Sequence, residues 1–194
     1  MSQPRIIAGT AKGIRLDSVP GDSTRPITDR VKEALFNILS TDIVDATFLD
    51  LFGGTGSVGI EALSRGARSC LFLELNPKAL LTLKNNLTKT RTAEKAQIMR
   101  GDALKFLSMP SLERFDYIYI APPQYKEMWI DAMLRLDRNN QLLSEDGWVI
   151  VQIHPIEYKE LDLENLVEFE QRKYGSTLLV FYHRRDLFTP AANS

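Results

Sequence analysis

Hydrophobic residues recur along this chain in a pattern that predicts short strands alternating with amphipathic helices. Apolar runs of strand length occupy residues 46–52, 69–75, 96–100, 115–120 and 147–153, as is typical of strands buried in a sheet. Between them, apolar residues return at helical spacing over 28–39, 57–65, 76–87, 104–107 and 129–136. Strands that alternate with helices indicate parallel crossovers. We therefore expect an α/β fold, a doubly wound sheet with helices on both faces.

The two ends of the chain follow a different pattern. Residues 5–16 place two short apolar runs around a loop with Gly9 and Gly13, which predicts an amino-terminal β-hairpin. Residues 165–183 form two strand-like runs around a turn at 174–176, most simply an antiparallel hairpin at a sheet edge. For a chain of 194 residues, we expect a hairpin arm and connector over 1–27, one main domain over 28–187 and a disordered tail over 188–194.

Composition places the chain among ordinary soluble globular proteins, with 44% hydrophobic and 25% charged residues. Cys70 is the one cysteine of the sequence, which excludes an internal disulfide and fits a reducing compartment. No apolar run approaches the length of a membrane span, and residues 1–3 open no signal peptide. These features predict a cytoplasmic protein without a membrane partner.

The net charge is −1, but the charges are unevenly distributed. Residues 1–32 carry six basic and three acidic side chains, whereas residues 155–170 carry six acidic side chains and one lysine. A basic amino-terminal arm suits contact with nucleic-acid phosphates, and an unevenly charged solvated surface explains the same counts equally well. The candidate RNA contacts are Arg5, Lys12, Arg15, Arg25 and Arg30.

A glycine-rich loop follows the first predicted strand of the main domain. Gly54, Gly56 and Gly59 form G-x-G-x-x-G, and Glu74 lies twenty residues beyond the first of them. This spacing is that of a dinucleotide-binding fingerprint, so a NAD-dependent oxidoreductase is a serious alternative. However, a pyrophosphate on this loop would lie close to the carboxylate of Asp50, and like charges repel.

Carboxylates at three successive strand ends favour S-adenosyl-L-methionine, which is cationic and carries no phosphate. Asp50 is placed for its methionine portion, Glu74 for the ribose hydroxyls and Asp102 for the adenine amine. Taken singly, each acid is equally well explained as a helix cap or surface charge, Asp102 above all. The glycines then allow close approach of the backbone to the ligand. The expected cofactor-binding residues are Asp50, Phe52, Gly53, Gly54, Gly56, Glu74, Leu75, Asp102 and Ala103.

The strand over 115–120 ends in Ala121, Pro122, Pro123, Gln124 and Tyr125, which we predict to be the catalytic segment. Two consecutive prolines stiffen the backbone and remove its N–H donors, which leaves the carbonyl groups of Ala121 and Pro122 to accept hydrogen bonds from an exocyclic amine. Tyr125 offers a flat face on which an extruded base stacks. A simple strand stop with an aromatic residue at its rim is the plain alternative.

Over nearly its whole length the sequence resembles the RsmD family, bacterial methyltransferases that modify the N2 atom of guanine 966 in 16S rRNA. The resemblance is carried by residues 5–16, 25–39, 48–67, 73–87, 101–107 and 172–182. Residues 25–37 are the most family-specific of these segments, whereas the glycine loop marks methyltransferases in general. The resemblance implies a class I, Rossmann-like methyltransferase with a seven-stranded sheet, S-adenosyl-L-methionine as donor and a guanine in a 16S rRNA loop as acceptor.

The chain departs from the family at one catalytic position. The usual motif is Asp or Asn, two prolines, and then Tyr or Phe, whereas here Ala121 replaces the polar residue and the aromatic Tyr125 is displaced by one position. Either Gln124 or a neighbouring carboxylate supplies the missing acceptor, or the protein binds its ligands and turns over poorly. Loss of one preorganised hydrogen-bonding group slows a reaction by roughly 10²–10³, so we expect a working enzyme.

The remaining candidates have plain interpretations. His154 and His183 are far apart and Cys70 is the single thiol, so no metal-ligand spacing exists and we expect no metal. Trp129 and Trp148 are expected to pack against the sheet. A DNA or nucleoside amine methyltransferase, or an RNA-binding protein without activity, would share much of this sequence pattern. We expect a monomer whose substrate is 16S rRNA within an assembled or assembling 30S particle.

Overall fold

The computed structural model describes residues 3–20, 27–110, 113–124 and 126–185, so predictions for Arg25, Tyr125 and the tail over 188–194 lie outside the described residues. The structure contains a seven-stranded sheet of order β3-β2-β1-β4-β5-β7-β6. Its strands are β1 (Thr47–Asp50), β2 (Ser69–Glu74), β3 (Ala96–Arg100), β4 (Phe115–Ile120), β5 (Leu143–Ile153), β6 (Leu166–Tyr174) and β7 (Thr177–Arg184). The α-helices are α1 (Asp29–Leu39), α2 (Ser57–Ser64), α3 (Pro77–Thr90), α4 (Ala103–Leu107) and α5 (Met128–Arg138). Short 3-10 turns are η1 (Ser40–Ile43), η2 (Ala93–Lys95), η3 (Asn140–Leu142) and η4 (Pro155–Glu157).

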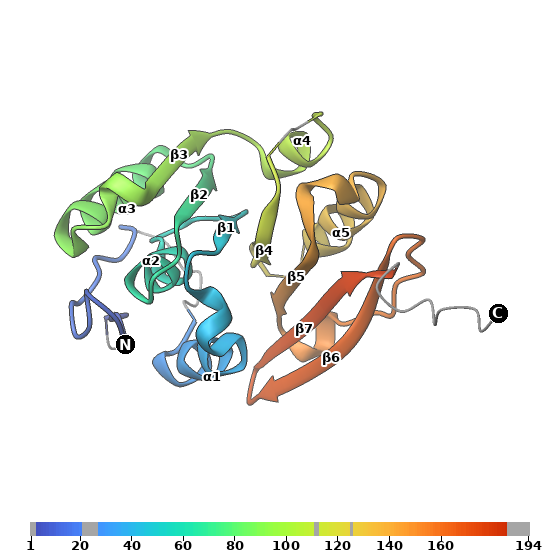
Figure 1. The fold of residues 1–194 in the computed structure, drawn as a ribbon, viewed down its shortest axis with the longest axis horizontal. Coiled ribbons are helices and arrows are strands. Elements are labelled where there is room, and N and C mark those ends of the chain that lie inside the picture. The colour runs from blue at the N-terminus through green and yellow to red at the C-terminus, as the bar shows by residue number, and fades with distance from the viewer. Residues whose placement is uncertain (1–2, 21–26, 111–112, 125, 186–194) are drawn as a thin grey trace.

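The connections confirm the predicted doubly wound sheet (Figure 1). Strands β1 to β5 pair in parallel, and β7 pairs antiparallel with both β5 and β6. The chain builds outward from β1 to β2 and β3, then returns to place β4 on the other side of β1. The order therefore reverses between β1 and β4. In such sheets, ligands bind beyond the carboxyl ends of the strands at this reversal.

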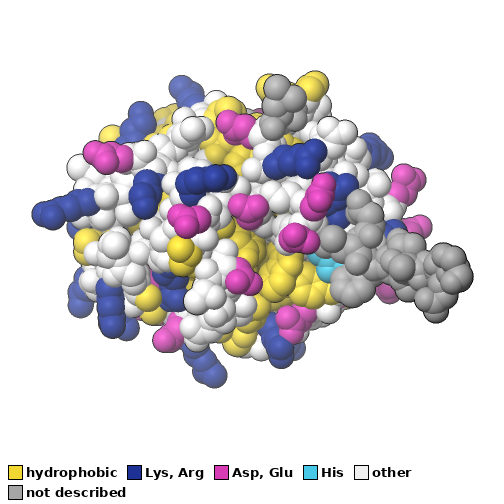
Figure 2. All heavy atoms as spheres, viewed as in Figure 1, with side chains coloured by type: hydrophobic (Ala, Val, Ile, Leu, Met, Phe, Trp, Pro, Cys, Tyr) yellow, Lys and Arg dark blue, Asp and Glu magenta, His cyan; other side chains and the backbone are white. Residues whose placement is uncertain are grey.

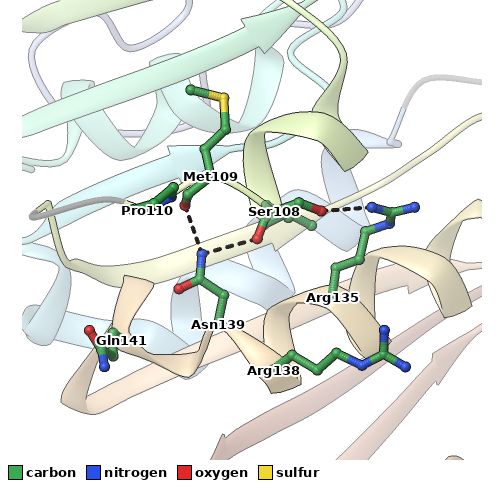
Figure 3. A pocket seen from close by; sticks show the side chains of 8 residues that line it. Ser108, Met109, Pro110, Arg135, Arg138, Asn139 and Gln141 are labelled. Carbon is green, nitrogen blue, oxygen red and sulfur yellow. Dashed lines mark hydrogen bonds between the residues drawn. The ribbon is translucent and has the colours of Figure 1, made fainter.

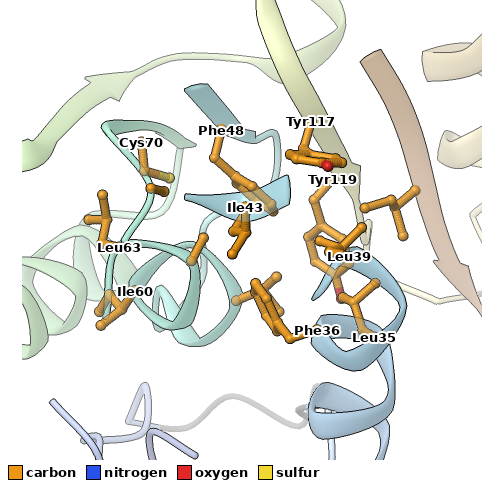
Figure 4. Close-up of a cluster of buried hydrophobic side chains, with 14 of the residues drawn as sticks. Leu35, Phe36, Leu39, Ile43, Phe48, Ile60, Leu63, Cys70, Tyr117 and Tyr119 are labelled. Atoms are coloured by element: carbon orange, nitrogen blue, oxygen red, sulfur yellow. The ribbon is translucent and has the colours of Figure 1, made fainter. Parts of the chain in front are cut away.

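Two hydrophobic cores lie on opposite faces of the sheet. One face is covered by α1, α2 and α3, whose apolar residues meet those of the central strands; Figure 4 shows Leu35, Phe36 and Leu39 of α1 packed near Tyr119 of β4. The other face is covered by α4 and α5. Helices on both faces are the reason that β1, β2 and β4 consist almost entirely of buried residues.

Helix boundaries follow the capping residues. Thr28 caps α1, because its Oγ1 accepts a hydrogen bond from the N–H of Val31 at 3.3 Å. Asn76 caps α3, where its Oδ1 accepts from the N–H of Lys78 at 2.9 Å and Pro77 occupies the first turn. Both helices therefore begin where the sequence predicts.

The amino-terminal segment turns back on itself and packs against the body of the protein, but its described residues form one isolated bridge and not the two strands of the predicted β-hairpin. A single bridge pairs Arg5 with Arg15, and the N–H of Ile6 donates to the carbonyl of Ile14 at 2.9 Å. Ile6 is fully buried. Gly9 has φ +82°, and a Cβ there would lie 1.8 Å from the carbonyl oxygen of Ser64 at the end of α2. This close approach makes the turn part of the core.

Charges of both signs share the surface. Figure 2 shows Lys and Arg side chains interspersed with Asp and Glu on the face that it presents, without one continuous basic patch among the described residues there. Among the residues that the structure describes, no helix is long and apolar enough to cross a membrane.

Candidate active site

Strand ends bring the predicted cofactor carboxylates together. Asp50 ends β1 between Phe72 of β2 and Tyr119 of β4, and Glu74 ends β2 opposite Arg100 of β3. The glycine loop begins directly after Asp50 and leads into α2. This is the carboxyl edge of the sheet at the point where its order reverses.

Asp50 is buried beneath the glycine loop, with 2% of its surface exposed. Its Oδ2 accepts a hydrogen bond from the N–H of Gly59 at 3.3 Å. Burial raises the pKa of Asp50 to about 7, and the charge of Glu74 adds to this rise, whereas N–H groups of Gly59 and Phe52 oppose it. A nearby cation would stabilise the ionised form of this carboxyl group and so lower its pKa.

Glu74 holds the loops on both sides of it. Its Oε2 accepts from the N–H of Gly54 at 2.8 Å, and its Oε1 accepts from the N–H groups of Leu75 and Asn76 at 2.8 and 2.7 Å. A carboxylate offers about four lone-pair positions. Glu74 can therefore accept a hydrogen bond from one ribose hydroxyl while it keeps its three backbone donors. To accept from both ribose hydroxyls, it would have to lose one of those three N–H donors.

The glycines of the loop serve different purposes. Gly54 has φ +52°, and a Cβ there would meet only the carbonyl oxygen of Phe52, at 3.8 Å, so Gly54 faces open space suited to a ligand. At Gly56, with φ +79°, a Cβ would lie 2.4 Å from Leu83. At Gly59 a Cβ would lie 2.3 Å from the ring of Phe72. Gly56 and Gly59 are thus required by packing, not by a ligand.

The remaining predicted cofactor residues lie along the same edge. Asp102 caps α4, with its Oδ1 accepting from the N–H of Lys105 at 2.9 Å, which confirms the plain role for one of its oxygens. Leu75 is 57% exposed, so it offers an apolar surface beside the carboxylates. Ala103 is buried, and Phe52 packs against the core under α4 and α5.

The predicted catalytic segment leaves the end of β4. Ala121 and Pro122 are partly buried, whereas Gln124 is exposed. No described residue donates a hydrogen bond to the carbonyl groups of Ala121 or Pro122, so both can accept from a substrate. Gln152 of β5, on the neighbouring strand, is engaged, since its Oε1 accepts from the hydroxyl of Tyr119 at 2.5 Å.

The described candidate RNA-contacting side chains are exposed, but the fold does not bring all of them to the same side of the protein. Arg5 forms an ion pair with Asp29 at 2.8 Å while its side chain stays 60% exposed, and Arg15 and Arg30 are both exposed. Lys12 is exposed in the turn that packs at the Ser64 end of α2. At about 1.5 Å per residue, Ser64 lies about 10 Å along α2 from the first residue of that helix. Since α2 begins at the carboxyl edge of the sheet, where the catalytic segment lies, Lys12 is at the opposite end of the helix from that segment.

Sequence reasoning missed three buried polar residues next to the site. Lys32, Glu61 and Asn86 are each 0% exposed. The available signal was their position on otherwise apolar helix faces: Lys32 shares a face with Leu35, Phe36 and Leu39 of α1. A polar residue on such a face must find partners inside the protein.

The histidines have structural surroundings. His154 caps η4, where its Nδ1 accepts from the N–H of Ile156 at 3.2 Å, and His183 is buried beside the ring of Phe169. Trp129 of α5 is buried in the core between that helix and the sheet, as expected, and Trp148 packs edge-on against Phe169. Among the described residues, no group of three potential ligands could hold a metal ion.

A cavity of about 620 Å³ lies elsewhere, between the carboxyl ends of α4 and α5 (Figure 3). Arg135 donates to the Oγ of Ser108 at 2.7 Å, and Asn139 donates to the carbonyl groups of Leu107 and Met109 at 3.0 Å each. Because α5 runs from the carboxyl edge of the sheet toward its amino edge, this cavity is remote from Asp50. Its polar groups join the two helices.

Comparison with known proteins decides the family. The family model described as "Conserved hypothetical protein 95" matches residues 4–183. The chain belongs to this family, that of the RsmD methyltransferases. It is 39% identical over 184 residues to "Putative rRNA methyltransferase YlbH" of Bacillus subtilis, covering 93% of this chain and 99% of the relative. It is 34% identical over 163 residues to "Ribosomal RNA small subunit methyltransferase D" of Escherichia coli, covering 84% and 77%.

The solved structures agree with this assignment. The structure of "Putative methyltransferase yhhF" of Escherichia coli superposes with a TM-score of 0.82 at 30% identity, covering 94% of this chain and 98% of that one. The predicted class I methyltransferase fold is therefore confirmed, and so is the RsmD resemblance. The donor of this family is S-adenosyl-L-methionine. Open space at Gly54, a free acceptor position on Glu74 and the exposed Leu75 fit that ligand.

Proposed function

We propose that this protein transfers a methyl group to the exocyclic N2 of a guanine in a 16S rRNA loop, of the guanine-966 type. The observation that carries the proposal is the position of the Ala121 and Pro122 carbonyl groups, to which no described residue donates a hydrogen bond, at the end of β4, next in the sheet to the strand that ends at Asp50. Family membership supports the substrate class. The protein would act in the cytoplasm as a monomer, on rRNA within an assembled or assembling 30S particle.

Catalysis requires that the amine lone pair be freed and aligned with the donor. S-adenosylmethionine supplies a methyl group on sulfur, whose carbon–sulfur electron pair returns to sulfur as the methyl joins N2 and one amine proton leaves to water. The carbonyl groups of Ala121 and Pro122 would accept hydrogen bonds from the amine and draw its lone pair out of conjugation with the ring. Pro122 and Pro123 keep that backbone rigid, which lets these acceptors act without reorganisation.

Two further residues complete the proposed acceptor site. Gln124 is exposed and carries an amide oxygen that could take the place of the side-chain acceptor absent at Ala121. Tyr125 would stack on the extruded base. Arg5, Arg15, Arg25 and Arg30 would contact phosphates, so the affinity for RNA should fall as the salt concentration rises.

Ala121 also favours a second candidate function, that of an RNA-binding protein with impaired catalysis. A methyl side chain offers no acceptor where the family usually carries one. The two candidates differ in turnover, not in binding. A protein of the second kind would bind donor and RNA with ordinary affinity and transfer methyl groups slowly or not at all.

A single-turnover assay separates the candidates. Excess protein is mixed with radiolabelled S-adenosylmethionine and 30S particles from a strain lacking the modification, and the labelled nucleotide is mapped. Labelling at one guanine N2 supports the proposal. Absence of transfer at every protein excess, together with normal binding of S-adenosylhomocysteine, would favour the second candidate.

A further inference from the structure

The amino-terminal segment contacts the glycine loop through a buried amide on one side. Asn86 of α3 is 0% exposed. Its Nδ2 donates to the carbonyl of Thr55 in the glycine loop at 2.9 Å and to the carbonyl of Asp17 at 3.1 Å. Its Oδ1 accepts from the N–H of Asp17 at 2.8 Å. One side chain therefore joins the loop to the connector that follows the amino-terminal turn.

A buried lysine makes the matching contact on the other side of the loop. Lys32 of α1 is 0% exposed, and its Nζ donates to the Oγ of Ser57 at 3.0 Å and to the carbonyl of Arg5 at 2.6 Å. Ser57 is the first residue of α2 and directly follows Gly56. Burial lowers the pKa of Lys32, and the Glu61 carboxylate, 3.4 Å from its Nζ, opposes that effect.

Glu61 fixes the segment along α2 at the same time. Its two carboxylate oxygens accept from the N–H groups of Ile7 and Ala8 at 2.8 and 3.0 Å. The segment over residues 4–17 is thus held in place by buried polar contacts at both of its ends and in its middle. Because Lys32, Glu61 and Asn86 are fully buried, water cannot readily replace a partner that one of them loses, so each of these contacts stabilises the arrangement.

The glycine loop depends on such outside contacts. Gly54 and Gly56 both adopt positive φ, and glycines bring no side chains with which to hold a conformation. Thr55 and Ser57, the residues on either side of Gly56, are the points at which Asn86 and Lys32 attach. The position of the loop is therefore set partly by α1, α3 and the amino-terminal segment.

We propose that the amino-terminal segment is a structural part of the methyl-donor site, held against the glycine loop by Asn86 and Lys32 as positioning residues. Removing either contact would let the loop leave its donor-binding conformation and would weaken donor binding even without RNA. The inference rests on the donor of the family and not on the proposed guanine substrate.

Calorimetric titration with S-adenosylhomocysteine tests this on the free, full-length protein. Asn86→Ala removes the contacts to Thr55 and Asp17, and we expect its dissociation constant to rise about tenfold, in line with the loss of one to two net hydrogen bonds. Thr82→Val is the matched control. Thr82 is buried one turn earlier on α3 and donates only to the carbonyl of Lys78 at 3.0 Å, so its loss should change affinity by less than about twofold.

Ser57→Ala provides a milder second variant. It removes the hydroxyl partner of Lys32 and leaves the contact between Lys32 and Arg5, so the melting temperature should change little while the dissociation constant rises about fivefold. In turnover assays both variants should raise the KM for the donor and leave the KM for RNA unchanged. Wild-type affinity in Ser57→Ala, or an Asn86→Ala effect no larger than that of Thr82→Val, would overturn the inference. Donor affinities answer this even where no RNA is methylated.

Discussion

Replacing Asp50 by asparagine should make the protein more stable at neutral and alkaline pH. Burial raises the pKa of this carboxyl group from 3.8 to about 7 in the folded state. Between those values the folded protein holds a proton that the unfolded chain has released, so the contribution of Asp50 to stability falls as the pH rises. It is least favourable above pH 7.

The size of the effect follows from the two pKa values. Each pH unit between 3.8 and 7 costs about 1.4 kcal/mol, which gives about 4 kcal/mol in total and about 3 kcal/mol between pH 5 and pH 8. The asparagine of the variant cannot ionise, and its amide oxygen can still accept from the N–H of Gly59. The quantity to compare is the free energy of unfolding of the variant minus that of the wild type. We expect this difference to be about 3 kcal/mol larger at pH 8 than at pH 5.

Urea denaturation of both proteins at pH 5, 6, 7 and 8 measures this difference directly. The other titrating groups are common to the two proteins and cancel in the comparison. The same variant should bind S-adenosylhomocysteine more weakly, because stability and ligand binding compete at this position. A difference in stability that is the same at all four pH values would refute the assignment of the raised pKa to Asp50.

Three further predictions concern other positions. Ala121→Asp should raise the single-turnover rate by about 10²-fold if a missing acceptor limits catalysis; an unchanged rate would show that Gln124 or the backbone already suffices. Gly59→Ala should destabilise the protein by about 1–3 kcal/mol, because the new methyl group meets the Phe72 ring at 2.3 Å, whereas Gly101→Ala, with no atom within 4 Å, should be nearly neutral in the same thermal melts. Asp116 has a lowered pKa, because hydrogen bonds from the N–H and hydroxyl of Thr47 and from Ser144 outweigh its burial. Its contribution is therefore present above about pH 4 and is lost as the pH falls through the lowered pKa. The loss of stability caused by Asp116→Asn should be largest at neutral pH and should shrink steadily as the pH is lowered below about 4, and a loss that stays constant or grows on acidification would contradict the sign.

The order of strands and helices was predictable from the sequence because hydrophobic periodicity is a local property. The run over 115–120 reads as a buried strand and is β4, and the Asn76-Pro77 cap marks the start of α3. The carboxylates at strand ends were predictable for the same reason, since parallel strands bring their carboxyl ends to one edge. The resemblance carried by residues 25–39 then named the chemistry.

Contacts between distant residues were not predictable in this way. The sequence predicted a basic amino-terminal arm, and only the structure shows that this segment packs against α2. There Glu61 accepts hydrogen bonds from the N–H groups of Ile7 and Ala8, and Ser64 donates one to the carbonyl of Ala8. The glycines looked alike, yet Gly54 faces open space while Gly59 is forced by the ring of Phe72.

The sequence by itself therefore determined the elements, their order and the class of chemistry, because each depends on residues close together along the chain. Only the tertiary structure decided which polar groups are buried together, as with Lys32, Glu61 and Asn86. The energy of such groups depends on partners 25 to 69 positions away, and their placement exists only once the sheet and helices have packed.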